Sequence, residues 1–280
     1  MWVEGMFLTG LCIAAIAFLA EYVDSTLGMG YGTTLTPVLM IMGYEPMQVI
    51  PAVLLSELFT GLLAGLAHHK AGNADFRPKL VKPGLIVRRI RELGLIASVK
   101  KDIPRDLRVV FVIAACSILG TLSAVFLAVG INKFYLKLYI GVMVLAIGIY
   151  ILLRRNKQCR FSWKKITGLG LLASFNKGMS GGGYGPVVTG GQILSGVESK
   201  NAIAITSLAE GLTCIVGFLA YFLVRGIQDW TLFPFLCIGA VLSVPLSVCT
   251  VKRLNTSYLN LAIGVLTTAL GIFTLAKILL

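Results

Sequence analysis

Apolar residues dominate ten segments of the 280-residue chain, and polar residues gather in the stretches between them. The segments are residues 6–27, 33–42, 47–67, 109–129, 134–153, 166–180, 184–194, 202–224, 232–251 and 259–280. Most have about the 20 residues that an α-helix needs to cross a hydrocarbon layer of ~30 Å, and none alternates like a half-buried strand. The pattern predicts an all-α polytopic membrane protein with about eight to ten hydrophobic segments.

Composition and charge support a membrane location. Hydrophobic residues make up 57% of the chain and charged residues 13%, whereas a soluble domain has about 25% charged residues. The net charge of +13 lies in two stretches, residues 68–108 with +7 and residues 154–165 with +6. Because cytoplasmic loops carry the excess of Lys and Arg, we expect a multi-pass protein of the inner (plasma) membrane with both basic loops in the cytoplasm.

The loop of residues 68–108 interleaves basic and apolar side chains. This pattern is typical of an amphipathic segment on anionic lipid headgroups, so we expect membrane lipid as a partner. We expect no nucleic-acid partner, because 41 residues do not supply a soluble fold around the charges.

An internal repeat appears at an ungapped offset of 153 residues. It pairs residues 28–60 with residues 181–213, and 11 of the 33 paired positions are identical. The sequence therefore predicts two homologous transmembrane repeats, residues 1–156 with the basic insertion 68–108 and residues 157–280. Five crossings per half, or three if segments 33–42 and 184–194 are re-entrant, give inverted repeats, and only a four-crossing half gives parallel ones. The distribution of basic residues favours inversion.

Each half carries a glycine cluster inside apolar sequence, at residues 28–34 and 178–185. Glycine weakens a helix by about 1 kcal/mol, so the clusters predict broken or re-entrant helices. The free N–H groups of a half-helix that begins after each break suit an anion, although small residues also serve close helix packing. The candidate substrate-binding residues are Gly28, Gly30, Tyr31, Gly32, Thr33, Thr34, Asn176, Lys177, Ser180, Gly181, Gly182, Gly183 and Tyr184.

Ionisable residues inside the spans are the candidate coupling residues. Glu57 and Glu210 match under the offset and lie near the middle of their spans, where a charge costs about 2.5–3.5 kcal/mol. They could carry protons, shape the cavity or satisfy N–H groups of the broken helices. Asp24 and Lys177 also match but have opposite charges, which leaves open a salt bridge between them or a fixed cation at Lys177 for an anionic substrate. The sequence contains no metal-ligand cluster, and we expect no cofactor.

These motifs resemble the TauE/SafE family of sulfite and organosulfur-anion exporters. The resemblance is carried by the glycine stretch of each half, by the motifs 43–46 and 196–199, and by the alanine-rich sequence that ends at Glu57 and Glu210. The triplet 181–183 fits the family pattern, whereas Met29 interrupts the first triplet and Gly190 replaces the proline that Pro37 supplies in the first half. The resemblance implies export of small anions such as sulfite, sulfoacetate or thiosulfate across the bacterial inner membrane without an organic cofactor.

Our primary hypothesis is a secondary transporter of a small anion, a sulfur oxyanion or sulfonate, that works by alternating access with or without proton coupling. A passive anion channel with a glycine-lined constriction is the alternative. An enzyme is disfavoured, because no nucleophile, base and orienting group occur together. The anion, the coupling ion, the direction of transport and the oligomeric state stay open.

Overall fold

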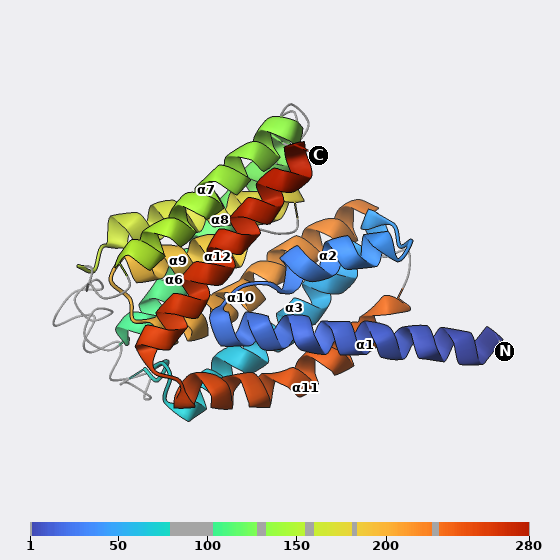
Figure 1. Cartoon of the computed structure of the whole chain (residues 1–280), viewed down its shortest axis with the longest axis horizontal. Coiled ribbons are helices and arrows are strands. Elements are labelled where there is room, and N and C mark those ends of the chain that lie inside the picture. The colour runs from blue at the N-terminus through green and yellow to red at the C-terminus, as the bar shows by residue number, and fades with distance from the viewer. Residues whose placement is uncertain are drawn as a thin grey trace, which may run out of the picture.

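The computed structural model describes residues 2–78, 103–127, 133–154, 160–180, 184–225 and 230–279, and within these ranges it contains α-helices and no strands. This confirms the predicted all-α fold (Figure 1). In chain order the helices are α1 (Trp2–Leu27), α2 (Tyr31–Ile41), α3 (Pro46–Ala71), α6 (Arg105–Leu127), α7 (Lys133–Arg154), α8 (Trp163–Ser180), α9 (Tyr184–Leu194), α10 (Ser199–Arg225), α11 (Leu232–Arg253) and α12 (Thr256–Leu279).

Five helices of the described part are long and apolar enough to cross a membrane. The qualifying stretches are Leu8–Leu27, Gln48–Ala71, Ser199–Leu223, Leu232–Arg253 and Thr256–Ala276. Large apolar side chains such as Leu19 and Leu242 point outward from these helices and are exposed on the protein. Outward-facing leucines are expected where the surrounding solvent is lipid.

The two glycine clusters lie next to two short helices of 11 residues each, α2 and α9. At 1.5 Å per residue each is about 16 Å long, roughly half of the hydrocarbon thickness, so neither can span the membrane as a helix. Gly28 and Gly30 have φ angles of 74° and 134°, which only glycine adopts readily, and they separate α1 from α2. Helix α2 then runs back toward the end of the molecule at which α1 begins (Figure 1).

The two helix breaks are packed directly against each other. A Cβ atom built on Gly185 at the start of α9 would lie 2.6 Å from the carbonyl oxygen of Gly28 and 2.6 Å from the Cα of Met29. The Thr189 hydroxyl of α9 donates a hydrogen bond of 2.7 Å to the same carbonyl oxygen. Segments about 160 residues apart in the chain therefore form one backbone junction at the centre of the protein.

The long helices pack in pairs that follow the two predicted repeats. Helix α1 packs with α11 and α8 packs with α6. The offset of 153 residues makes α1 equivalent to α8, and the helix order after the basic insertion makes α6 equivalent to α11 and α7 equivalent to α12. The other main pairs join equivalent helices, α3 with α10 and α7 with α12, and the latter two lie side by side (Figure 1). Both of these pairs are antiparallel: Gly61 meets Gly211 while Gly65 meets Leu208, and Gly141 meets Leu275 while Gly148 meets Thr268.

The basic insertion of residues 68–108 is described only at its two ends, and the amphipathic segment predicted within it lies outside the described residues. The carboxylate of Asp106 accepts hydrogen bonds from the Asp75 backbone N–H at 3.1 Å and from the Asn201 amide at 2.6 Å. These contacts attach both ends of the insertion to α10.

Replacing Gly185 with alanine is expected to destabilise the protein, because the new methyl group would meet backbone atoms of the first break. Overpacking of this kind costs about 1–3 kcal/mol, so the melting temperature of the detergent-purified protein should fall. Gly168→Ala is the control, because nothing lies within 4 Å of a Cβ at that exposed position of α8. Equal melting temperatures for the two variants would contradict the tight junction.

Candidate functional site

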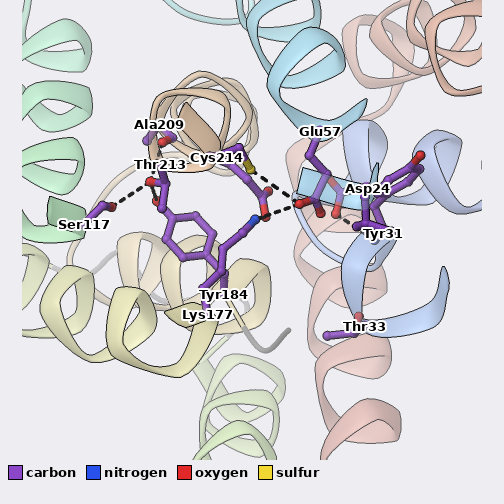
Figure 2. A network of polar contacts seen from close by, with 12 residues as sticks. Asp24, Tyr31, Thr33, Glu57, Ser117, Lys177, Tyr184, Ala209, Thr213 and Cys214 are labelled. Carbon is purple, nitrogen blue, oxygen red and sulfur yellow. Dashed lines mark hydrogen bonds and ion pairs between the residues drawn. The ribbon is translucent and has the colours of Figure 1, made fainter. Parts of the chain in front are cut away.

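A buried lysine and two buried glutamates form the centre of the candidate site. The Nζ atom of Lys177, near the end of α8, lies 3.0 Å from Oε2 of Glu57 on α3 and 2.6 Å from Oε1 of Glu210 on α10. Only 6% of Lys177, 3% of Glu57 and 6% of Glu210 is exposed. Figure 2 shows the ammonium group and the Glu57 carboxylate pointing toward each other. One cation thus links helices from both halves of the chain.

A small cavity adjoins this ion-pair cluster. It measures about 220 Å³ including its opening, and it is lined by Asp24, Gly30, Gly32, Thr33, Glu57, Lys177, Tyr184, Gly185, Pro186 and Glu210. The lining combines backbone from the start of α2 and the start of α9 with three carboxyl groups and one ammonium group. The cavity therefore lies at both helix breaks and is bordered by most of the buried charges of the described residues.

The first break is capped by a carboxylate. Oδ1 of Asp24 accepts a hydrogen bond of 3.1 Å from the backbone N–H of Tyr31, the first residue of α2. A negative charge at this position is stabilised by the unpaired N–H groups and the dipole of the helix N-terminus. The capping role that the sequence suggested for Glu57 and Glu210 thus belongs to Asp24 in the first half.

The second break carries a cation at the equivalent position. Lys177 replaces Asp24 under the 153-residue offset, and its Nζ lies 5.1 Å from the ring centroid of Tyr184, the first residue of α9. Lys177 forms its ion pairs with Glu57 and Glu210 and none with Asp24 among the described residues. Of the two roles left open for Asp24 and Lys177, the direct salt bridge is absent from this structure.

Tyr31 and Tyr184, the first residues of α2 and α9, are held in place by hydrogen bonds between hydroxyl groups. The Tyr31 hydroxyl lies 2.9 Å from the Ser56 hydroxyl, and the Tyr184 hydroxyl lies 3.2 Å from that of Thr213. Thr213 is in turn 2.7 Å from the Ser117 hydroxyl of α6 (Figure 2). Because both tyrosines are buried, these contacts satisfy polar groups that would otherwise be costly in the interior.

The structure brings together many of the candidate residues and separates others. Gly30, Gly32, Thr33, Lys177 and Tyr184 line the cavity with Asp24, Glu57 and Glu210. Gly28, Tyr31 and Asn176 are buried but do not line it, and Thr34 lies on the exposed side of α2. Gly181, Gly182 and Gly183 lie outside the described residues, and so does the side chain of Ser180.

Three residues near the cluster have no place among the sequence candidates. Cys214 contacts Oε2 of Glu57 at 3.5 Å, and Thr189 joins the two breaks. Glu21, one helical turn before Asp24 on α1, is only 2% exposed. The sequence did contain a signal for Glu21, because an acidic residue inside an apolar span is unusual. The internal repeat did not mark this position, because the equivalent residue of the second half, Ser174, has no charge.

No group of three or more His, Cys, Asp or Glu side chains that could hold a metal ion occurs in the part of the chain that the structure describes.

Comparisons with known proteins identify relatives of the chain. A family model described as "Sulfite exporter TauE/SafE" matches residues 13–87 and 92–274. The "Probable membrane transporter protein YtnM" of Bacillus subtilis (strain 168) is 25% identical over 270 residues, which cover 91% of this chain and 78% of that protein. No solved structure matches the chain.

Replacing Lys177 with methionine is expected to destabilise the protein strongly, because it leaves two buried carboxylates without their cation. Removal of one partner from a buried ion pair costs about 3–5 kcal/mol. The triple variant Lys177→Met, Glu57→Gln, Glu210→Gln removes all three charges and should recover most of the lost melting temperature. A triple variant that melts no higher than the single variant would contradict the ion-pair assignment.

Proposed function

Because the chain belongs to the TauE/SafE sulfite exporter family and is a membrane transporter, we propose that it is a secondary transporter of a small anion, a sulfur oxyanion or sulfonate. The observation that carries this proposal is the buried Lys177 in the last turn of α8, which faces the ring of Tyr184 at the start of α9 and lies next to a cavity lined by residues of both helix breaks. The family also agrees with the expectation that the chain is not an enzyme.

The anion site that we propose lies at the second break. In the first half, the Asp24 carboxylate already occupies the N-terminus of α2. In the second half the equivalent residue is Lys177, so a bound anion would take the place that a carboxylate has in the first half. Lys177 would supply the charge, and the first turn of α9 would supply backbone donors. Gly185, which has no side chain, lines the cavity in this turn.

The charge around the cavity gives a reason to couple transport to protons. Asp24, Glu57 and Glu210 contribute three carboxyl groups against the single ammonium of Lys177. If all were ionised, the cavity would repel an anion, because charges interact strongly in a medium of low dielectric constant. Binding of a proton by a carboxyl group in or beside the cavity would reduce the repulsion. We therefore propose that a proton is bound together with the anion.

Alternating access between two inverted repeats is the mechanism that we propose. It is supported by the antiparallel packing of the equivalent helices, α3 against α10 and α7 against α12. Two equivalent helices that run antiparallel are related by a two-fold axis perpendicular to them, as inverted repeats require. The cavity lies where α3 and α10 meet the two breaks. A relative movement of the halves would open it first to one side of the membrane and then to the other. We place both basic loops in the cytoplasm, as the positive-inside rule requires.

Transport is tested in proteoliposomes that contain the purified protein. We expect saturable flux and counterflow of sulfite or of a sulfonate such as sulfoacetate, with flux reduced at least tenfold by Lys177→Met. Lys164→Met, which removes an exposed lysine from the first turn of α8, is the matched control and should transport normally. Absence of flux for every small anion by folded protein would refute the proposal, and single-channel currents without counterflow would indicate a pore.

Proton coupling is tested separately with a sulfonate, which stays ionised over the pH range of the experiment, so that pH acts on the protein and not on the solute. An inward proton gradient is expected to drive sulfonate accumulation above its outside concentration, and a protonophore should abolish this. Sulfonate flux that does not change with the proton gradient would refute proton coupling, and the proposal that the protein transports an anion would stand.

A further inference from the structure

Glu21 is a buried carboxyl group that the ion-pair cluster does not include. Its Oε1 atom accepts a hydrogen bond of 2.5 Å from the Ser25 hydroxyl, and its Oε2 atom lies 3.2 Å from the Thr60 hydroxyl of α3. It has no ion-pair partner among the described residues. A carboxylate buried with hydroxyl partners alone is costly in its ionised form, so this group needs another explanation.

Glu21 lies beside the proposed anion cavity. It is three residues before Asp24, so both side chains point from the same face of α1, and Asp24 lines the cavity. Its contact Thr60 follows Glu57 by three residues on α3, which brings Glu21 to the same helix face as the ion-pair cluster. A charge on Glu21 therefore changes the electrostatic potential in the cavity.

The other ionisable groups around Glu21 come from several helices. They are Asp24 on α1, Tyr31 on α2, Glu57 on α3 and Glu210 on α10. His68, at the end of α3, bonds through Nε2 to the Ser25 carbonyl oxygen and receives the Asn73 amide at Nδ1, a pattern that a neutral imidazole satisfies. The basic residues of α11, Lys252 and Arg253, are exposed at its end, and Lys277, the charged residue of α12, lies in its last turn.

The partners of Glu21 differ from those of Glu57 and Glu210 in one chemical respect. A serine or threonine hydroxyl can donate to a carboxylate and can equally accept from a protonated carboxyl. The Lys177 ammonium can only donate, so a proton on its carboxylate partners opposes these ion pairs. Glu21 can therefore gain or lose a proton while its neighbours only reorient their hydroxyl groups.

The second half shows that packing alone does not require a carboxyl here. Under the 153-residue offset, Ser174 takes the place of Glu21 and Thr213 takes the place of Thr60. In that half, Ser174 and Thr213 are joined through the Ser117 hydroxyl at 3.0 Å and 2.7 Å. A neutral hydroxyl network thus fills the position that holds Glu21 in the first half.

We propose that Glu21 binds the proton that is coupled to anion transport, so that the anion at Lys177 and the proton at Glu21 occupy the protein together. This inference rests on the proposed function and assigns the coupling site to one residue. The proton enters as H⁺ from water on the side of anion entry and leaves on the other side. Asp24, Glu57 and Glu210 then keep their capping and ion-pair contacts throughout the cycle.

The test compares wild type, Glu21→Gln, Glu21→Asp and Glu198→Gln in proteoliposomes with a sulfonate and sodium-free buffer. Glu21→Gln, which imitates the protonated acid, should keep measurable sulfonate exchange but accumulate no more sulfonate under a proton gradient than without one. Glu21→Asp should keep gradient-driven accumulation at a lower rate. Glu198→Gln changes the net charge equally at an exposed site and should behave as wild type.

Gradient-driven accumulation by Glu21→Gln at the wild-type level would overturn the assignment and leave the transporter intact. Wild-type protein without anion flux would overturn the proposed function, and this inference with it.

Infrared difference spectra of detergent-purified protein provide a readout that does not require transport. Addition of the sulfonate should produce the carbonyl band of a protonated carboxylic acid in wild type, with a shifted band in Glu21→Asp and none in Glu21→Gln. If Glu21→Gln does not fold, the spectra of wild type and Glu21→Asp are compared instead. A carbonyl band at the same frequency in both would refute the assignment of the proton to Glu21.

Discussion

The ammonium group of Lys177, shared between Glu57 and Glu210, is the interaction on which the centre of the molecule depends. Each of these charges alone would be expensive inside a membrane, and each is tolerated because the others lie within hydrogen-bond distance. The cluster requires α8, α3 and α10 to approach closely. Small residues permit this, because Gly61 of α3 and Gly211 of α10 meet with almost no side chain between their backbones.

The two halves use a common scaffold to hold different charges. In both, the first residue of the short helix is a buried tyrosine whose hydroxyl meets a hydroxyl on the following long helix, Ser56 for Tyr31 and Thr213 for Tyr184. On the preceding helix, however, the first half has Glu21 and Asp24 where the second has Ser174 and Lys177. In the transport cycle that we propose, the first half would bind the proton and the second half the anion, so equivalent positions of the two halves would hold different groups.

The sequence was sufficient to predict the apolar segments, the positions of both helix breaks and four buried ionisable residues, Asp24, Glu57, Lys177 and Glu210, because each leaves a local mark in composition. It could not decide the partner of Lys177, since a glutamate on α3 and one on α10 become neighbours only after the helices cross. The sequence also could not show that Thr34 lies on the exposed side of α2, because this depends on how α2 packs against its neighbours. Glu21 was not predicted, because the equivalent residue of the second half is Ser174 and the internal repeat therefore does not mark this position as charged.

The junction between the two breaks also limits how the proposed transporter can move. Gly185 abuts the backbone of Gly28, and the hydrogen bond from Thr189 fixes this contact from the other side. Separation of the halves at this point would expose polar backbone in the interior of the membrane, which is costly. A rocking motion about the junction avoids that cost, because the backbone contact is kept while the outer ends of α3 and α10 move apart. In the alternating-access cycle that we propose, the junction would be the pivot about which the two halves move.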